Sequence, residues 1–105
     1  MEKHCDVIAE APDGQTAVDM AQELRPDIAL LDVSMPVLNG FGAARLIRMR
    51  APEVGIIMVS SYSDPGYIEE GSNIGVRGFV LKGSALFQLP QAIADVVNGG
   101  TFHPD

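Results

Sequence analysis

The sequence predicts an α/β fold built on a parallel β-sheet. Three short apolar runs, each about the length of a strand, end in a small or charged polar residue. Continuous apolar runs of this kind are typical of parallel strands that are buried on both faces. Between them lie stretches whose apolar positions repeat with the period of a helix. Strands that alternate with helices favour a parallel sheet with right-handed crossover connections.

Four strands are expected, and the last three are the apolar runs. The first strand is a short segment in which apolar and polar residues alternate weakly. The expected strands are Asp6–Ala11, Ile28–Asp32, Gly55–Ser60 and Gly78–Lys82. Turn residues separate each strand from the helix that follows it. The order along the chain is therefore strand, helix, strand, helix, repeated to the end.

Four helices are expected, and proline and glycine mark their ends. Asp13 fits the N-cap of the first helix, Pro26 ends that helix, and Gly99 ends the last one. The expected helices are Gln15–Arg25, Phe41–Arg50, Gly66–Ile74 and Leu86–Val97. The third contains Gly, Ser and Asn in succession, which are weak helix formers. The residues expected on the buried face of the first two helices are Ala17, Val18, Met20, Ala21, Leu24, Phe41, Ala44, Leu46 and Ile47.

Length and composition describe one ordinary globular domain of 105 residues. Seven Lys and Arg against fourteen Asp and Glu give a net charge of −7, so we expect no direct binding to nucleic acid or to an anionic membrane. Cys5 is the only cysteine, which excludes an intramolecular disulfide, and with His4 and His103 it cannot build a zinc site of the usual spacing. No apolar run approaches the roughly 20 residues that span a bilayer, and no signal-peptide pattern is present. We expect a cytoplasmic protein.

Each apolar run delivers a polar side chain to the carboxyl end of its strand: Asp32, Ser60 and Lys82. Each has an ordinary explanation by itself, such as an aspartate that caps a turn or a solvated lysine. Adjacent parallel strands, however, bring these ends to one edge of the sheet, where open α/β sheets bind their ligands.

Together the three side chains suit the transfer of a phosphoryl group. The Asp32 carboxylate would be the nucleophile, Lys82 would pair with the charge that it gains, and the Ser60 hydroxyl would donate to a phosphoryl oxygen. A divalent metal is expected to bridge the phosphoryl and carboxylate oxygens, because two anions must otherwise approach each other.

The sequence around these positions resembles the receiver domain of two-component response regulators over essentially its whole length. The matching features are Leu30–Gly40 with its Asp, Met, Pro and Gly, the strand-end Ser60, and Gly78–Lys82. Glu10–Gly14 matches the turn after the family's second strand. The absence of a proline after Lys82 and the ending Asn98–Phe102 are similar to receivers that are fused to helix-turn-helix output domains.

This resemblance implies a flavodoxin-like, doubly wound parallel sheet with the strand order 2-1-3-4-5. It implies that Asp32 accepts a phosphoryl group from a histidine kinase and that Lys82 is the site lysine. It also implies that Ser60 is the switch hydroxyl, that Phe79 is the switch aromatic, and that the backbone carbonyl of Ser34 is a ligand of Mg²⁺.

The resemblance further implies a conformational switch. Ser60 would turn toward the phosphoryl group and Phe79 would move inward, which would repack the surface around Gly66–Ile74. Tyr62 lies two residues after Ser60, where the family tunes dephosphorylation. The implied output is the control of transcription through a fused or partner DNA-binding domain.

The chain departs from the family at its start. The family's first strand and most of its first helix have no counterpart here, and the acidic pair that ends this strand and binds magnesium is absent. We therefore expect residues 1–105 to form one N-terminally incomplete receiver domain with poor magnesium affinity and slow or absent phosphorylation. A truncation, a misassigned start site and a naturally degenerate receiver are the three explanations.

The missing strand is central in the family's sheet, so its loss leaves a gap of about 5 Å. Either Val7–Ala11 moves to pair with Ile28–Leu31, or another chain supplies the pairing. The last helix would also expose an apolar stripe. Its residues are Leu86, Leu89, Ile93 and Val97. Because exposed stripes and unpaired edges favour association, we expect a dimer or a larger assembly.

Two other function classes compete with the phosphorylated receiver. One is a pseudo-receiver that works without phosphorylation as a dimerisation or interaction module. The other is an enzyme. Phosphatases and phosphotransferases with an aspartyl nucleophile usually carry a second aspartate two residues later, whereas this chain has Ser34 there. We therefore expect a signalling module and no enzyme.

Overall fold

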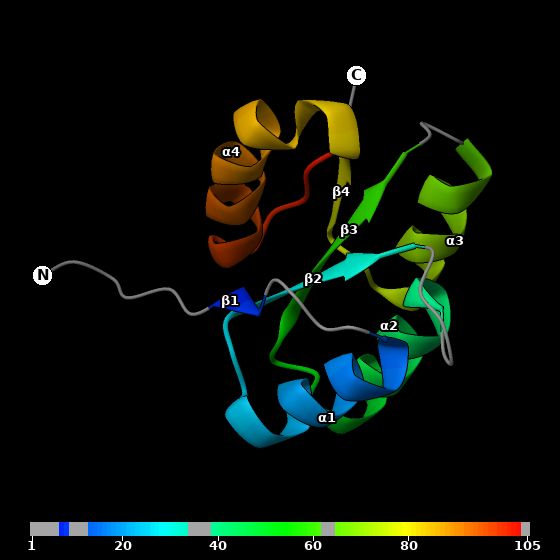
Figure 1. Cartoon of the computed structure of the whole chain (residues 1–105). Helices are drawn as coiled ribbons and strands as arrows, with labels where there is room; N and C mark the ends of the chain where they lie inside the picture. The colour runs from blue at the N-terminus through cyan, green and yellow to red at the C-terminus, as the bar shows by residue number, and fades with distance from the viewer. Residues whose placement is uncertain (1–6, 9–12, 34–38, 62–64, 104–105) are drawn as a thin grey trace, which may run out of the picture.

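A computed structural model describes residues 7–8, 13–33, 39–61 and 65–103 of the chain. Within these residues, four parallel strands form one sheet. The strands are β1 (Val7–Ile8), β2 (Ile28–Asp32), β3 (Gly55–Ser60) and β4 (Gly78–Leu81). Their order across the sheet is their order along the chain, as Figure 1 shows. The predicted α/β fold with a parallel sheet is confirmed.

Helices follow the strands where the sequence predicts them. They are α1 (Gly14–Leu24), α2 (Gly40–Arg50), α3 (Pro65–Ile74) and α4 (Ala85–Val97), with a short 3₁₀ helix η1 (Lys82–Ser84) before α4. The predicted N-cap is present, because the Asp13 side chain accepts a hydrogen bond from the Thr16 amide at 2.7 Å. Asn39 caps α2 in the same way, accepting from the Gly42 amide at 2.9 Å.

The strand β1 pairs directly with β2, so the sheet has no gap where the family's first strand would lie. Val7 pairs with Ile28, and Ile8 pairs with Ala29, so β1 lies directly beside β2. This is the first of the two arrangements considered, in which the N-terminal strand moves inward. The other residues of the predicted strand Asp6–Ala11 lie outside the described part of the chain.

The helices cover the two faces of the sheet unequally. Successive right-handed crossovers that advance in one direction place their helices on one face, which accounts for α1, α2 and α3. The helix α4 follows the last strand and packs on the opposite face, mainly over β3 and β4 (Figure 1). Helices therefore lie on both faces, as in a doubly wound sheet.

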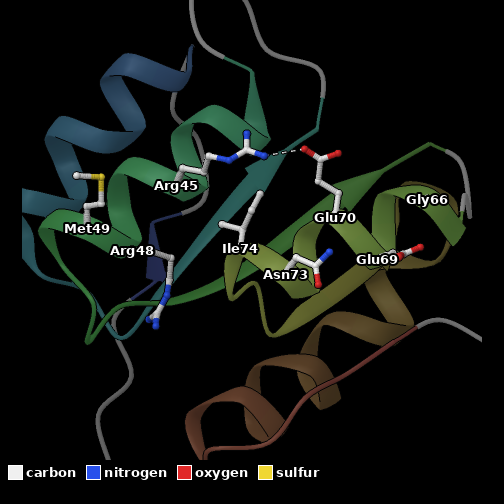
Figure 2. Close-up of a pocket in the computed structure, with 8 residues that line it drawn as sticks. All are labelled: Arg45, Arg48, Met49, Gly66, Glu69, Glu70, Asn73 and Ile74. Carbon is white, nitrogen blue, oxygen red and sulfur yellow. Dashed lines mark hydrogen bonds and ion pairs between the residues drawn. The ribbon is translucent and has the colours of Figure 1, made fainter.

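The helix α3 is held chiefly against α2. The rings of Phe41 and Tyr67 lie with their centroids 5.7 Å apart, and Arg45 forms an ion pair with Glu70 at 2.8 Å (Figure 2). Gly71 is the only residue of α3 that is fully buried. The contact of α3 with the rest of the protein is therefore narrow.

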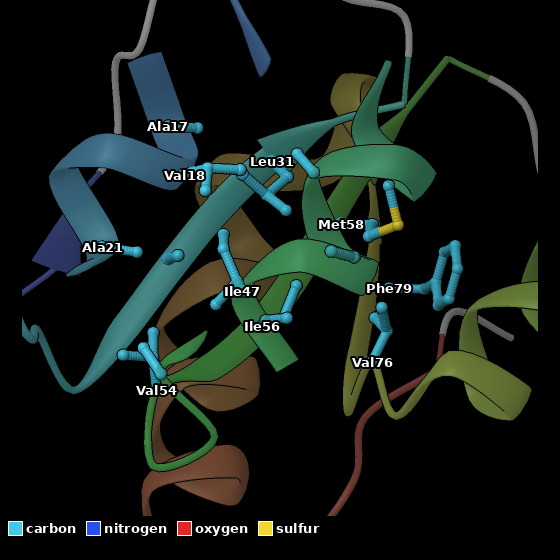
Figure 3. Close-up of a cluster of buried hydrophobic side chains, with 14 residues drawn as sticks. Ala17, Val18, Ala21, Leu31, Ile47, Val54, Ile56, Met58, Val76 and Phe79 are labelled. Atoms are coloured by element: carbon cyan, nitrogen blue, oxygen red, sulfur yellow. The ribbon is translucent and has the colours of Figure 1, made fainter. Parts of the chain in front are cut away.

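Two hydrophobic clusters form the core, one on each face of the sheet. The larger one lies beneath α1, α2 and α3, and Figure 3 shows Leu31, Ile47 and Met58 within it. The smaller one is formed by Ile28, Ile57, Val80, Ala92 and Val96 beneath α4. The strands β2, β3 and β4 each contribute to both clusters, because their successive side chains point to opposite faces.

The predicted burial of the helices needs two corrections. Leu24 is 61% exposed, because the chain turns at Arg25 in a left-handed conformation and places Pro26 in the interior instead. Met20, Phe41 and Leu46 are half-buried. The remaining predicted residues on the buried faces of α1 and α2 are buried: Ala17, Val18, Ala21, Ala44 and Ile47.

The apolar stripe expected on the last helix is only partly exposed. Leu89, Ile93 and Val97 are half-buried against the smaller cluster, since α4 lies on the sheet with this side. The side chain of Leu86 lies outside the described part of the structure. The large apolar side chain that α4 does expose is Phe87, at 86%.

The ends of α1 and α2 are tied together at the surface. Arg25 forms an ion pair with Glu53, and this hydrogen bond lowers the pKa of the Glu53 carboxyl below its usual range. Both side chains are about half exposed, so water and salt weaken the pair.

Within the described residues, none of the helices has the length and apolar character needed to cross a membrane.

Candidate functional site

The candidate site lies at the edge of the sheet where β2, β3 and β4 end. Asp32 is the last residue of β2 and is in register with Val59, one residue before the end of β3. Ser60 ends β3 in register with Leu81, the last residue of β4, and Lys82 follows at once. The three predicted residues therefore occupy neighbouring strand ends.

Asp32 and Lys82 are in direct contact. The Lys82 Nζ atom lies 2.6 Å from Asp32 Oδ2, and the two side chains remain 49% and 33% exposed, respectively. The carboxylate is thus held by a cation and is still accessible from solvent.

Ser60 reaches the same edge from the other face of the sheet. Side chains along a strand point alternately to the two faces of the sheet, so Asp32 and Lys82 lie on the same face as Leu30 and Val80, which pack in the cluster beneath α4. Ser60 lies on the opposite face, the same as Met58 of the larger cluster. Its side chain is 5% exposed. The structure therefore joins Asp32 to Lys82 and places Ser60, which is buried, at the neighbouring strand end.

Phe79 lies on the same face as Ser60. It is in register with Met58, is 3% exposed, and packs between the sheet and α3 beside Val76 (Figure 3). A Cβ atom placed on Gly71 would come within 2.5 Å and 2.6 Å of ring atoms of Phe79. The ring thus occupies space that only a glycine in α3 leaves open. The sequence alone did not show this role, although a glycine in the middle of a helix is a usable signal.

A second glycine brings α2 against the site. The Gly40 amide donates to the Val33 carbonyl at 3.1 Å, and a Cβ on Gly40 would lie 2.4 Å from the Asp32 carbonyl oxygen. The beginning of α2 therefore touches the backbone that carries the carboxylate. The sequence showed Gly40 as part of the stretch Leu30–Gly40 that resembles the family, but it did not show this contact, because close approach between backbones leaves no local pattern.

Two predicted positions, Ser34 and Tyr62, lie outside the described residues. Among the residues that are described, no three His, Cys, Asp or Glu side chains cluster closely enough to hold a metal ion. Magnesium is normally held by one or two carboxylates together with other oxygen ligands. Asp32 is the carboxylate of the described site that could be one of these ligands, and the chemistry below rests on Asp32, Lys82 and Ser60.

The Asp32–Lys82 pair is expected to contribute little to stability, since both side chains are substantially exposed. We predict that Lys82→Ala lowers the free energy of unfolding by less than about 1 kcal/mol. Urea unfolding of wild type, Lys82→Ala, Asp32→Ala and the double variant measures the coupling between the two residues. A coupling well above this value would mean that the pair is a structural element of the fold.

Comparisons with known proteins agree with this arrangement. The sequence matches the family model for the response regulator receiver domain over residues 1–94. The transcriptional regulatory protein LnrK of Bacillus subtilis (strain 168) is 36% identical over 104 residues, which cover 99% of this chain and 47% of LnrK. The transcriptional regulatory protein DegU of Brevibacillus brevis is 33% identical over 105 residues, covering 99% of this chain and 44% of DegU.

Solved structures show the same fold. A LuxR-family two-component response regulator from Aurantimonas sp. SI85-9A1 has a TM-score of 0.83 and 28% identity, covering 90% of this chain and 68% of that one. The receiver domain of AraT, a response regulator from Geobacillus stearothermophilus, has a TM-score of 0.77 and 28% identity, covering 88% and 71%.

The chain belongs to the response regulator receiver domain family. Its sheet, with helices on both faces, is the flavodoxin-like fold of that family. The chain spans about half the length of the curated relatives that it matches, and those relatives are transcriptional regulators.

Proposed function

We propose that this chain is the phosphoryl-accepting receiver of a transcriptional response regulator, with Asp32 as the acceptor and a histidine kinase as the donor. The observation that carries the proposal is the Asp32 carboxylate, held 2.6 Å from the Lys82 ammonium at the carboxyl edge of the sheet and still open to solvent. The family match supports the same assignment.

The chemistry is a transfer from a phosphohistidine to a carboxylate. An oxygen of Asp32 attacks the phosphorus, the bond from phosphorus to the imidazole nitrogen breaks, and an acyl phosphate remains on Asp32. Because the side chain gains negative charge, its attraction to Lys82 becomes stronger. Ser60 then donates a hydrogen bond to a phosphoryl oxygen from the inner face of the sheet.

The response would run through Phe79 and α3. A movement of Ser60 toward the phosphoryl group changes the space near the end of β3, and Phe79 lies two residues before the end of β4 on the same face. The helix α3 rests on this ring through Gly71. A fused or partner DNA-binding domain that reads this surface would then control transcription in the cytoplasm.

The proposal is tested by phosphoryl incorporation from acetyl phosphate, with and without magnesium. Intact-mass spectrometry of the wild-type chain is expected to show slow incorporation of the mass of one phosphoryl group, in keeping with the poor magnesium affinity expected from the sequence. Asp32→Asn is expected to abolish it, and Asp19→Asn, which neutralises an exposed carboxylate on α1, is expected to leave it unchanged. Equal incorporation in Asp32→Asn would exclude Asp32 as the acceptor.

One observation favours the pseudo-receiver as a second candidate. The described residues provide no three-ligand metal cluster, and metal normally assists phosphoryl transfer between anions. In this case the wild-type chain would incorporate no phosphoryl group. Beryllofluoride with magnesium would also leave the NMR signals of Phe79 and its neighbours unchanged, whereas a competent receiver would show shifts there.

A further inference from the structure

The chain after α4 folds back along the outer edge of β4. The backbone turns at Gly99, which has a positive φ of 88°, and the Gly100 amide donates to the Asp95 carbonyl at 2.8 Å. Phe102 then forms a parallel bridge with Gly78, and Figure 1 shows this red end of the chain beside β4. A short fifth segment is thereby added to the sheet, and it lies beyond residue 94, where the family match ends.

Two backbone hydrogen bonds hold this segment to β4. The Phe102 amide donates to the Arg77 carbonyl at 2.9 Å, and the Phe79 amide donates to the Phe102 carbonyl at 2.9 Å. A third bond anchors the turn, since Arg77 Nη1 donates to the Gly99 carbonyl at 2.9 Å. The Phe102 side chain packs against the smaller cluster beneath α4. The segment is therefore fixed to the strand by its main chain and to the core by its ring.

Without this segment, β4 would be an edge strand. Its other side pairs with β3 over the four positions from Gly78 to Leu81. On the outer side, the Phe79 amide is bonded to Phe102, and the Leu81 amide lies 3.4 Å from the side-chain oxygen of Gln88 on α4. A strand edge with unpaired amides opens more readily than a paired one. The bridge at Phe102 therefore stabilises the outer edge of β4.

The strand β4 also leads directly to the lysine of the Asp32 site. Lys82 follows the last residue of β4, and its Nζ atom lies 2.6 Å from Asp32 Oδ2. The Lys82 side chain is 49% exposed, so packing around it does little to fix its position. The place of the ammonium group at the sheet edge therefore depends on the strand that precedes it. A displacement of β4 relative to β2 would move the ammonium away from the carboxylate.

We propose that Phe102 is a positioning residue for the phosphoryl transfer to Asp32: its main chain pairs with β4 and so holds Lys82 beside the acceptor. This inference rests on the proposed function of Asp32. Phe102 acts through the strand and takes no part in the chemical step. The effect on rate is large for a distant residue, because a reacting group misplaced by about 1 Å can slow a reaction about a hundredfold.

Replacing Phe102 by proline tests the pairing, since proline has no amide to donate to Arg77. Hydrogen exchange at the Phe79 amide, followed by NMR, is expected to become about five- to tenfold faster, as the loss of a backbone hydrogen bond predicts. The ¹³C shift of the Asp32 carboxyl group is expected to move toward its value in Lys82→Ala, because the ammonium leaves the carboxylate. Neither measurement requires phosphorylation.

The same variant tests the role in phosphoryl transfer. With acetyl phosphate and magnesium, the rate at which Phe102→Pro gains the mass of a phosphoryl group is expected to fall about tenfold or more below that of the wild type. Phe102→Leu keeps both backbone hydrogen bonds and an apolar side chain, and its rate is expected to stay close to that of the wild type.

Two further variants separate the pairing from the effects of proline and of an unfolded chain. His103→Pro introduces the same residue one position later, where it favours the extended backbone that Phe102 needs, and is expected to behave as the wild type. Arg77→Ala removes the side-chain bond to Gly99 at an exposed position. It is expected to shift the Phe79 exchange and the Asp32 carboxyl signal in the same direction as Phe102→Pro, but less. If thermal melting shows that Phe102→Pro does not fold, Arg77→Ala decides the question.

Val54→Ala separates positioning from stability. Val54 is 1% exposed and directly precedes β3, at the edge of the sheet opposite to Asp32. Its truncation is expected to lower the free energy of unfolding through the cavity that it leaves. At a temperature where the variant is fully folded, the Asp32 carboxyl signal and the rate of phosphoryl incorporation are expected to be those of the wild type.

Three results would overturn the proposal. The first is an unchanged Phe79 exchange rate in both Phe102→Pro and Arg77→Ala. The second is faster exchange while the Asp32 carboxyl signal keeps its wild-type position, which would make the segment a purely structural element. The third is an equal loss of rate in His103→Pro or Val54→Ala. If the wild-type chain incorporates no phosphoryl group, the proposed function fails, and the exchange and carboxyl measurements still decide whether Phe102 positions Lys82.

Discussion

Replacing Gly40 by alanine is expected to destabilise the protein by about 3 kcal/mol, the largest effect of any single methyl group at the site. The added Cβ would lie 2.4 Å from the Asp32 carbonyl oxygen, 2.5 Å from the Met58 methyl carbon and 3.0 Å from the Val33 Cα atom. The methionine side chain can move, but the Asp32 oxygen and the Val33 Cα are backbone atoms at the end of β2 and directly after it. Alanine lowers the conformational entropy of the unfolded chain, which stabilises the folded protein by only about 0.4–1 kcal/mol. The steric clash therefore dominates.

The same substitution also reports on function. Because the start of α2 would have to move away from β2, Asp32 would lose its position relative to Lys82. Urea unfolding measures the loss of stability, and NMR shifts of Asp32 and Lys82 measure the displacement. Gly83→Ala is the matched control, since no heavy atom lies within 4 Å of its added Cβ. Equal stability of the two variants would contradict the close approach.

Replacing Gly71 by alanine is expected to destabilise the protein by about 1–2 kcal/mol and to displace the Phe79 ring. Helix propensity alone predicts the opposite sign, because alanine is favoured over glycine by about 1 kcal/mol inside a helix. The contacts decide the outcome: the added Cβ would lie 2.5 Å and 2.6 Å from Phe79 and 3.4 Å from the Val76 Cβ atom. Both residues are buried, so the ring and α3 must separate.

A double-mutant cycle isolates this contact. Phe79→Leu removes the ring atoms that the alanine meets, so Gly71→Ala is expected to cost less in that background, with a coupling between about 0.5 and 3 kcal/mol. Ser72→Ala, on the exposed side of the same helix, is expected to stabilise slightly through propensity. The Met58 methyl signal, next to the ring, reports its displacement by NMR. If the losses of unfolding free energy caused by Gly71→Ala and Phe79→Leu simply add in the double variant, Gly71 and the Phe79 ring are not in contact.

The elements of the fold could be predicted from the sequence because their signals are local. The apolar run Ile28–Asp32 is a strand with the predicted bounds, and Asp13 caps its helix as expected. The strand ends that carry Asp32, Ser60 and Lys82 followed from the same logic, since parallel strands align their carboxyl ends. The contact between Asp32 and Lys82 is the strongest case, because two residues 50 positions apart meet at 2.6 Å.

What the sequence did not show depends on packing between distant segments. Leu24 fits the apolar pattern of its helix, but the turn at Arg25 leaves it exposed. The contacts of Gly40 and Gly71 could not be predicted, because a glycine does not reveal which atom occupies the space that its missing Cβ leaves. The ion pair between Arg45 of α2 and Glu70 of α3 likewise forms only because folding brings the two helices side by side.

The order of the strands also bears on how the chain folds. Every paired segment in the sheet is a neighbour along the chain, with partners such as Val7 and Ile28, Ile28 and Gly55, and Ile57 and Gly78 only 21 to 27 residues apart. The loops that these pairings close are of similar length, so the entropy lost in closing them differs little from one pairing to the next. Each parallel pairing needs a complete strand–helix–strand unit, so the sheet is expected to form more slowly than a helical bundle and to grow by one such unit at a time from β2 and β3. The described part of β1, Val7–Ile8, lies at an edge of the sheet, so its amide hydrogens are expected to exchange early.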